Sequence, residues 1–178
     1  MNRFSMLLSA TLLASELMTM PGQQDVEELS ALTNLPVEQL QCNVLRRKVR
    51  EFSLAEAQAL MTIADAEAGN QGIIGRILVM AVVLNRVAGE EWPDNIIDVI
   101  NEDGQFQPIS DGRYYEVKIS REAHLALAYI EKGYPIDTEI IGFEASSNGK
   151  VLEKYFKYAY TVGGHDFYVR KPEVANEM

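Results

Sequence analysis

The chain has 178 residues and a net charge of −10, with 47% hydrophobic and 24% charged residues. This size and composition favour one soluble globular domain with at most a small appendage. The excess of acidic residues, all of it within residues 51–178, repels phosphate backbones and argues against nucleic-acid binding.

The cysteine and histidine content excludes two common kinds of site. Cys42 is the only cysteine, so the chain has neither an intramolecular disulfide nor a cysteine zinc site. Its two histidines, His124 and His165, make no convincing metal site on their own. We therefore predict neither a metal nor a cofactor.

Residues 1–20 allow two interpretations. Arg3 followed by a short apolar stretch is typical of a signal peptide. However, Leu12 occupies a position before the cleavage site that favours a small residue, so a retained N-terminal helix is the alternative. The first interpretation predicts a secreted or cell-envelope protein, and the second a protein held in the cytoplasm until its release. Residues 21–50 are predicted to form an N-terminal helical segment.

A helix is predicted from Leu54 to Ala68, and both of its ends are marked in the sequence. Ser53 precedes it with Glu56 three residues later, which is the spacing of a capping box. Gly69 follows its last residue, as is common at helix C-termini. A second helix, apolar nearly all round, is predicted from Ile73 to Val87 at the centre of the domain. Its apolar run is too short for a membrane span, which needs about 20 residues.

Glu67 falls on the apolar face of the first predicted helix. It continues the i, i+3, i+4, i+7 stripe that starts at Leu60, whereas Asp65 falls where water can reach it. Burial and the negative end of the helix dipole both disfavour a charged carboxylate, so we expect the pKa of Glu67 to be raised. An acid that is protonated near neutral pH can give a proton to a leaving oxygen. The alternative is that the helix frays and Glu67 faces solvent.

The middle of the chain is predicted to hold two further helices and a polar loop region. A short helix covers Asn95–Ile100, with Pro93 in its first turn. Residues 101–115 are irregular, polar and aromatic, as sugar-binding loops often are. Ser120 caps a helix that runs to about Lys132.

The C-terminal part changes to the periodicity of strands. A strand is predicted at Glu139–Ala145, followed by a two-residue hairpin turn at Ser147–Lys150, which contains the favoured Asn-Gly pair. Gly163 and Gly164 then form a turn that enters a strand ending at Val169. Helices followed by a small β part predict an α+β domain.

Several short motifs occur in one order between Ser53 and Val169. They are Ala66-Glu67-Ala68-Gly69, Asn85-Arg86-Val87, Trp92-Pro93-Asp94-Asn95-Ile96, Gly104-Gln105-Phe106, the strand of Phe143, and Gly164-His165-Asp166-Phe167-Tyr168. No single motif is specific. As a set, they resemble the SleB-type cell wall hydrolases, a family that includes spore cortex-lytic enzymes.

The resemblance implies a lysozyme-like α+β fold that is predominantly α, with a helical core and a small β-hairpin region. It implies that residues 51–178 form a monomeric cell-wall hydrolase domain that cleaves peptidoglycan at the muramic acid–glucosamine bond. Glu67 would be the catalytic acid. Family members commonly carry a second acidic residue soon after this glutamate, but Asn70 and Gln71 occupy that place here. A mechanism that needs a second carboxylate from this loop is therefore disfavoured.

Two cleavage mechanisms and one non-catalytic role fit this expectation. We predict a lytic transglycosylase, in which Glu67 protonates the leaving oxygen and then acts as base on the C6 hydroxyl of muramic acid. A non-catalytic peptidoglycan-binding module, in which Glu67 only hydrogen-bonds sugar, is one alternative. The other is a hydrolytic muramidase, which needs a second carboxylate. The candidates for that carboxylate are Asp65, Asp94, Asp103 and Asp111.

Five further residues are predicted to bind substrate. Among them, His165 is the best candidate, because it follows two glycines in a turn. Phe106 and Tyr168 have an alternative interpretation as buried packing residues. The full set is Asn85, Gln105, Phe106, His165 and Tyr168.

Overall fold

The computed structural model describes residues 30–31, 51–133 and 136–172. The predicted signal peptide or helix at residues 1–20, Cys42 and nearly all of the predicted segment 21–50 lie outside the described residues. The described part is mostly helical with one small antiparallel sheet, which confirms the predicted α+β class. No helix within this part is both long enough and apolar enough to cross a membrane.

Helix α4 spans Leu54–Ala68, the bounds that the sequence predicts. The Ser53 hydroxyl accepts a hydrogen bond from the backbone N–H of Glu56, and the Glu56 carboxylate accepts one from the backbone N–H of Ser53. This capping box satisfies N–H groups that would otherwise lack partners at the start of the helix. The helix ends at Gly69, where a Cβ would lie 2.7 Å from the carbonyl oxygen of Asp65. Glycine therefore fits where the chain leaves the helix.

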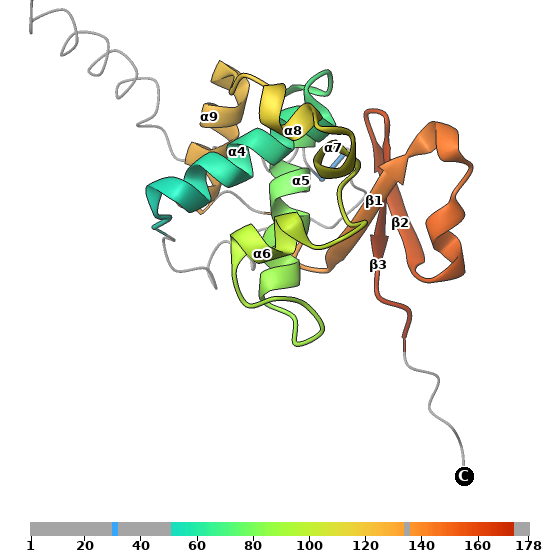
Figure 1. Ribbon diagram of the computed structural model, residues 1–178. Coiled ribbons are helices and arrows are strands. Elements are labelled where there is room, and N and C mark those ends of the chain that lie inside the picture. The colour runs from blue at the N-terminus through green and yellow to red at the C-terminus, as the bar shows by residue number, and fades with distance from the viewer. Residues whose placement is uncertain (1–29, 32–50, 134–135, 173–178) are drawn as a thin grey trace, which may run out of the picture.

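Helix α5 (Gly72–Val87) is the central helix that its apolar run predicts. Every residue from Ile77 to Leu84 is at most 2% exposed. The helix packs against α4, α6 (Ile96–Asn101), α9 (Arg121–Glu131) and β1 (Ile140–Ala145). Figure 1 shows α5 running between the other helices and the sheet. Other elements cover α5 on several sides, so its surface must be apolar nearly all round.

The segment between α6 and α9 differs from the prediction. Helix α6 begins after its N-cap, Asn95, so Pro93 precedes the helix instead of lying in its first turn. The stretch predicted as irregular contains two short helices, α7 (Gln107–Asp111) and α8 (Arg113–Glu116). Gly112 joins them with a φ of 86°, a backbone conformation that glycine adopts readily. These helices are too short to show a clear period in the sequence.

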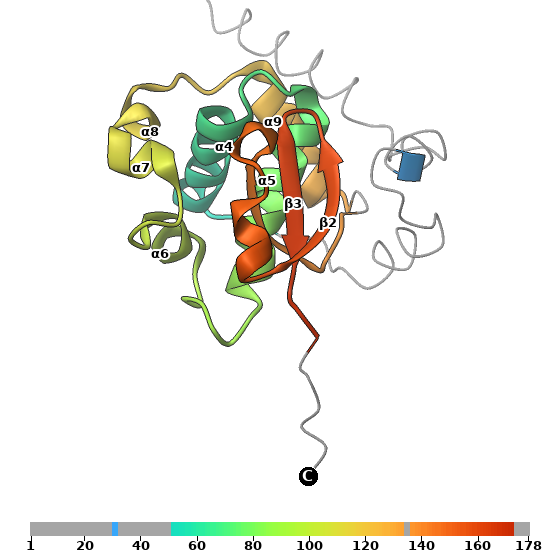
Figure 2. The same cartoon turned by 90° about the vertical axis from the view of Figure 1, so that its right-hand side faces the viewer.

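The three strands form an antiparallel sheet in the order β1-β3-β2, with β2 at Lys157–Val162 and β3 at His165–Val169. β1 pairs with the last strand, so that Phe143 lies opposite Phe167. Strands β2 and β3 form the hairpin, and their turn is Gly163 and Gly164. Figure 2 shows β3 beside β2, with α5 behind them.

The predicted hairpin turn at Ser147–Lys150 is wrong. These residues belong to a connection with two 3-10 turns, Ser146–Asn148 and Val151–Lys154. Gly149 and Lys150 both have positive φ angles, 76° and 60°, and they join the two turns. The chain therefore leaves β1 without pairing with the next strand, and the Asn-Gly pair serves a longer loop.

Asp65 is buried, which corrects the prediction that it faces water. Its carboxylate accepts a hydrogen bond from Arg76 of α5 at 2.6 Å, and two more from the backbone N–H and the hydroxyl of Ser120. Ser120 is also the N-cap of α9, as predicted. One carboxylate thus joins α4, α5 and α9. The helical wheel shows only that Asp65 lies off the apolar stripe, and it does not show a charged partner on another helix.

Candidate active site

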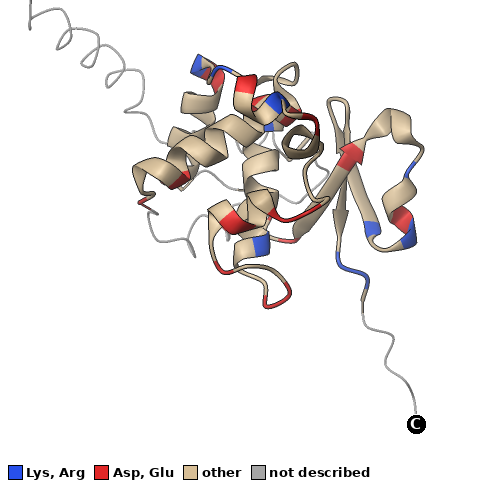
Figure 3. Ribbon diagram, in the orientation of Figure 1, with Lys and Arg blue, Asp and Glu red and all other residues tan. Residues whose placement is uncertain are grey.

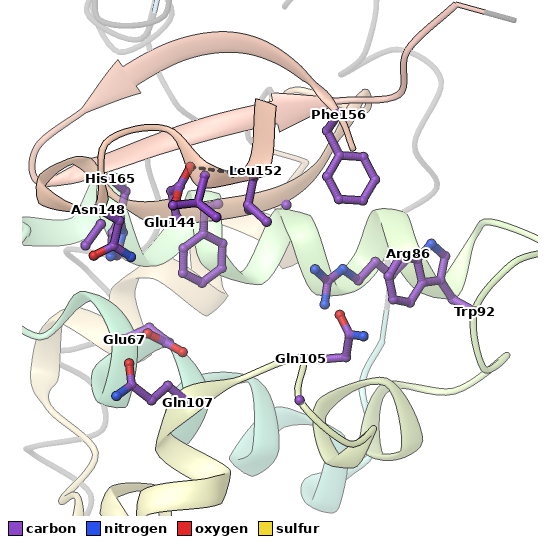
Figure 4. A pocket seen from close by; sticks show the side chains of 15 residues that line it. Glu67, Arg86, Trp92, Gln105, Gln107, Glu144, Asn148, Leu152, Phe156 and His165 are labelled. Atoms are coloured by element: carbon purple, nitrogen blue, oxygen red, sulfur yellow. Dashed lines mark hydrogen bonds between the residues drawn. The ribbon is translucent and has the colours of Figure 1, made fainter. Parts of the chain in front are cut away.

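A pocket of about 440 Å³ lies between the helical part of the domain and the sheet. Figure 4 shows Glu67 on one wall and His165 and Glu144 on the other, with Arg86 and Trp92 toward one end. The pocket is therefore lined by elements that are far apart in the sequence. The other polar side chains in its lining are Gln105, Gln107 and Asn148.

Glu67 lies in the last turn of α4, where it is partly buried and its carboxyl group makes no hydrogen bond to any described residue. Burial raises the pKa of its carboxyl to about 7, while Arg113 lowers it and Asp111 raises it by smaller amounts. Arg113 also pairs with Asp111 and donates a hydrogen bond to the carbonyl of Ala66. The raised pKa agrees with the expectation from the sequence, and burial, one of the two causes expected there, is the largest. The Glu67 carboxyl is thus protonated in part near neutral pH, where an ordinary glutamate is ionised.

His165 begins strand β3 and faces the same pocket. It is 6% exposed, and its buried Nδ1 has no hydrogen-bond partner among the described residues. Burial lowers the pKa of the imidazole more than the nearby Asp166 raises it, so the ring is neutral at neutral pH. The ring of Phe143 packs against it, with 4.9 Å between the ring centroids. A neutral imidazole has one donor and one acceptor nitrogen, so it can donate a hydrogen bond to a sugar hydroxyl or amide group or accept one from it.

Gln71 holds the turn that presents His165. The backbone N–H of Gly164 donates a hydrogen bond to Gln71 Oε1 at 3.2 Å. Gly163 has a φ of 58°, which is strained for other residues, and a Cβ there would lie 2.7 Å from the same oxygen, so this position favours glycine. Gln71 is one of the two residues, with Asn70, at the place where the resemblance led us to expect a second acid. In this chain, its side chain anchors the β2–β3 turn.

Glu144 is a pocket residue that the sequence reasoning missed. It is the only acidic residue of β1 and gives the red band on that strand in Figure 3. It is buried, and its Oε1 accepts hydrogen bonds from the backbone N–H of Leu152 at 2.9 Å and from the hydroxyl of Tyr168. An acidic residue inside an otherwise apolar strand was the available signal. The pocket thus holds two carboxyl groups, one on each wall.

Three of the residues predicted to bind substrate do not line this pocket. Asn85 is buried and donates hydrogen bonds to two backbone carbonyls at and before the start of β1. Phe106 is 1% exposed and packs in the core near Phe143. Tyr168 is fully buried, and its hydroxyl donates a hydrogen bond to the Glu144 carboxylate. These three side chains are therefore buried away from the pocket, whereas the predicted residues Gln105 and His165 line it.

The four acids proposed as a second carboxylate do not line the pocket either. Asp65 is held in its buried ion pair, and Asp111 pairs with Arg113 near the surface. Asp94 and Asp103 are exposed. Among the described residues, no group of three or more histidine, cysteine, aspartate or glutamate side chains is placed to hold a metal ion.

Comparisons with known proteins match this part of the chain. A family model described as Cell Wall Hydrolase matches residues 70–168. The spore cortex-lytic enzyme of Halalkalibacterium halodurans is 28% identical over 94 residues, which are 53% of this chain and 24% of that protein. The chain thus spans about a quarter of that relative's length.

Two solved structures share the fold. The catalytic domain of the germination-specific lytic transglycosylase SleB from Bacillus anthracis superposes with a TM-score of 0.57 and 21% identity, covering 67% of this chain and 98% of that one. The catalytic domain of the Bacillus cereus SleB protein gives a TM-score of 0.56 and 20% identity, covering 68% and 97%. The helical core and small sheet described above therefore form a known architecture, although the identities are low.

Proposed function

The chain belongs to the cell wall hydrolase family, and on this premise we propose that it is a lytic transglycosylase that cleaves peptidoglycan between muramic acid and glucosamine. The observation that carries the proposal is Glu67, a partly buried carboxyl group with a pKa of about 7 that lines the pocket and makes no hydrogen bond to any described residue. The Bacillus anthracis protein that shares the fold is a lytic transglycosylase by its own description, which supports the same assignment.

In the proposed reaction, Glu67 acts twice. Its O–H donates a proton to the glycosidic oxygen while the bond from that oxygen to the anomeric carbon of muramic acid breaks. The C6 hydroxyl oxygen of the same muramic acid then bonds to the anomeric carbon, and its proton passes to the Glu67 carboxylate. The product is a 1,6-anhydro sugar, the acid is restored, and no water is consumed. Gln105 and the neutral His165, which line the pocket, would bind the sugar during these steps.

One observation favours hydrolysis as the second candidate. Glu144 lies in the same pocket on the wall opposite Glu67, where a second carboxylate could activate water. Its Oε1 is already held by two donors, so only Oε2 is left to take a proton from water. A single-carboxylate mechanism makes no such demand, which is why we place transglycosylation first.

Analysis of the cleavage products separates these candidates. Purified peptidoglycan is digested in heavy-oxygen water with the wild type and with Glu144→Gln, and the released fragments are analysed by mass spectrometry. We expect both proteins to release fragments with anhydro-muramic ends, lighter by one water than reducing ends and free of heavy oxygen. Labelled reducing ends, together with a loss of activity of about 100-fold or more in Glu144→Gln, would establish hydrolysis instead. Binding without any release of fragments by the wild type would identify a non-catalytic module.

The rate of cleavage should fall as the pH rises through about 7. Glu67 must be protonated to donate, and burial gives it a pKa of about 7. Above that pH, kcat/KM should drop about tenfold for each further pH unit. The measurement is the initial rate of fragment release across the pH range, with circular dichroism to show that the protein stays folded. A rate that is flat well above pH 7 would contradict the role of Glu67 as the acid.

A further inference from the structure

Arg86 lies in the pocket, away from Glu67, and most of its hydrogen-bonding capacity is unused (Figure 4). It is 6% exposed. Within the described residues, the only hydrogen bond of its side chain runs from Nε to the carbonyl oxygen of Ile141, at 2.7 Å. Its Nη1 is buried and has no hydrogen-bond partner in the described part of the chain. A buried guanidinium normally has its donors satisfied, because an unpaired buried donor is costly.

Arg76 provides an internal comparison. It lies on the same helix and is 4% exposed, yet all three of its nitrogens donate hydrogen bonds. Nε pairs with the Asp65 carboxylate, and the two Nη atoms donate to the backbone carbonyls of Gly72 and Gly69. The fold thus satisfies a buried arginine where the arginine has a structural role. Arg86 differs in that it faces the pocket and, among the described residues, only its Nε has a hydrogen-bond partner.

The neighbours of Arg86 contact the face of its guanidinium, so that N–H donors at its edge can bind a hydrogen-bond acceptor from a ligand. Its carbon lies 4.4 Å from the centroid of the Trp92 ring and 5.2 Å from that of Phe106, so aromatic rings are placed to pack on the guanidinium. Burial lowers the pKa of Arg86 to about 10, so the group stays cationic at neutral pH. Glu102 is near enough to raise that pKa by a smaller amount, but it forms no ion pair with Arg86. The positive charge is therefore not neutralised by contact with any described residue.

We propose that Arg86, with Trp92 beside it, forms a subsite for a carboxylate that the substrate carries on its muramic acid. This inference rests on the proposed function. Guanidinium groups bind carboxylates through paired N–H bonds, and these charge-assisted bonds are stronger than neutral ones. N-acetylglucosamine carries no charge, whereas muramic acid carries a lactyl group that ends in a carboxylate or in a peptide with carboxylates of its own. The subsite would therefore distinguish peptidoglycan from uncharged glycans.

The test measures binding without turnover. Trp92 is the only tryptophan of the chain, so its fluorescence reports directly on this end of the pocket. The protein is the full chain with Glu67→Gln. Two ligands carry carboxylates: a muramic acid–glucosamine tetrasaccharide with free lactyl carboxylates, and the same sugar bearing peptides. Each is compared with a derivative in which every carboxylate has been converted to a methylamide. Chitotetraose is the uncharged control. We expect at least one of the two carboxylate ligands, the bare sugar or the peptide-bearing sugar, to bind at least about tenfold more tightly than its methylamide.

Variants identify the residue responsible. Added to the Glu67→Gln protein, Arg86→Met should abolish the preference for carboxylates, and Arg86→Lys should keep part of it. Lys118→Met, which removes a positive charge from an exposed position outside the pocket lining, should leave the preference intact. Circular dichroism checks the fold. If Arg86→Met does not fold, the comparison of carboxylate with methylamide in the parent and in Arg86→Lys still decides the matter.

The outcomes are separable. Equal binding of carboxylate and methylamide forms by the parent, or a preference that survives in folded Arg86→Met, would overturn the subsite. Preference for the bare sugar alone assigns the lactyl carboxylate, and preference for the peptide-bearing sugar alone assigns the peptide. Wild-type protein that cleaves peptidoglycan while the parent shows no preference retains the proposed function and loses the subsite. A carboxylate preference in the parent, together with a wild-type protein that never cleaves peptidoglycan, retains the subsite and loses the proposed function.

Discussion

Replacing Glu67 by glutamine is expected to lower the rate of glycan cleavage by about 10³-fold or more. The amide keeps the size of the side chain but cannot donate a proton to the leaving oxygen, and general acid–base catalysis typically contributes about 10²–10⁴-fold. Because Glu67 is proposed to act in both steps, the loss should lie toward the upper end of that range. The measurement is the release of soluble fragments from purified peptidoglycan at a pH near 6, where wild-type Glu67 is mostly protonated.

The same substitution should make the protein more stable at alkaline pH. The pKa of Glu67 is about 7 in the folded protein against an ordinary value of 4.5. The stability that the protonated form contributes is therefore present below pH 4.5 and is lost as the pH rises through about 7. Above that range, Glu67→Gln avoids the cost of ionising a buried acid. Allowing for screening by solvent, the gain should be about 1–3 kcal/mol.

Urea unfolding of the two proteins at several pH values measures this gain. Glu116→Gln removes an exposed carboxylate from α8 and serves as the matched control, for which no such pH-dependent gain is expected. An active Glu67→Gln protein would remove Glu67 from the mechanism. An inactive variant with unchanged stability at alkaline pH would show that burial does not hold the Glu67 proton.

The parts of the fold that the sequence predicts best are those governed by local signals. The bounds of α4 follow from Ser53 and Glu56 at one end and Gly69 at the other, all within one turn of the helix ends. The central helix follows from an apolar run that is too long for an ordinary strand. Both signals act over a few residues, so a single sequence contains them in full.

The rest of the candidate site depends on contacts between distant parts of the chain. Glu144 reaches the pocket because β1 pairs with β3 instead of with the strand that follows it, and no local pattern encodes that choice. Tyr168 and Asn85 carry polar groups, but the fold uses those groups to support the sheet from within. The place of Glu67 and the raised pKa of its carboxyl could be predicted because one helix determines both its position and its burial.

Asp65→Ala is expected to lower the free energy of unfolding by about 3–5 kcal/mol, the cost typical of breaking a buried ion pair by removing one partner. Asp65 Oδ1 accepts hydrogen bonds from Arg76 Nε at 2.6 Å and from the Ser120 hydroxyl at 2.8 Å, and Oδ2 accepts one from the Ser120 backbone N–H at 2.6 Å. Without the carboxylate, Arg76 becomes a buried charge that keeps only the carbonyls of Gly69 and Gly72. Because Gly69 and Gly72 follow Glu67 closely in the chain, we expect the Glu67 side chain to be held less firmly in the pocket as well.

A second substitution separates the loss of the charge pair from the loss of packing. Asp65→Leu combined with Arg76→Met removes both charges and keeps apolar volume, so much of the stability lost in Asp65→Ala should return. Asp103→Ala, at an exposed acid, controls for the change in net charge and should shift stability by less than about 0.5 kcal/mol. Urea unfolding with an unchanged m-value provides the comparison. If Asp65→Ala costs no more than Asp103→Ala, the Asp65–Arg76 pair does not hold α4 to α5, and the position of Glu67 must depend on the apolar core alone.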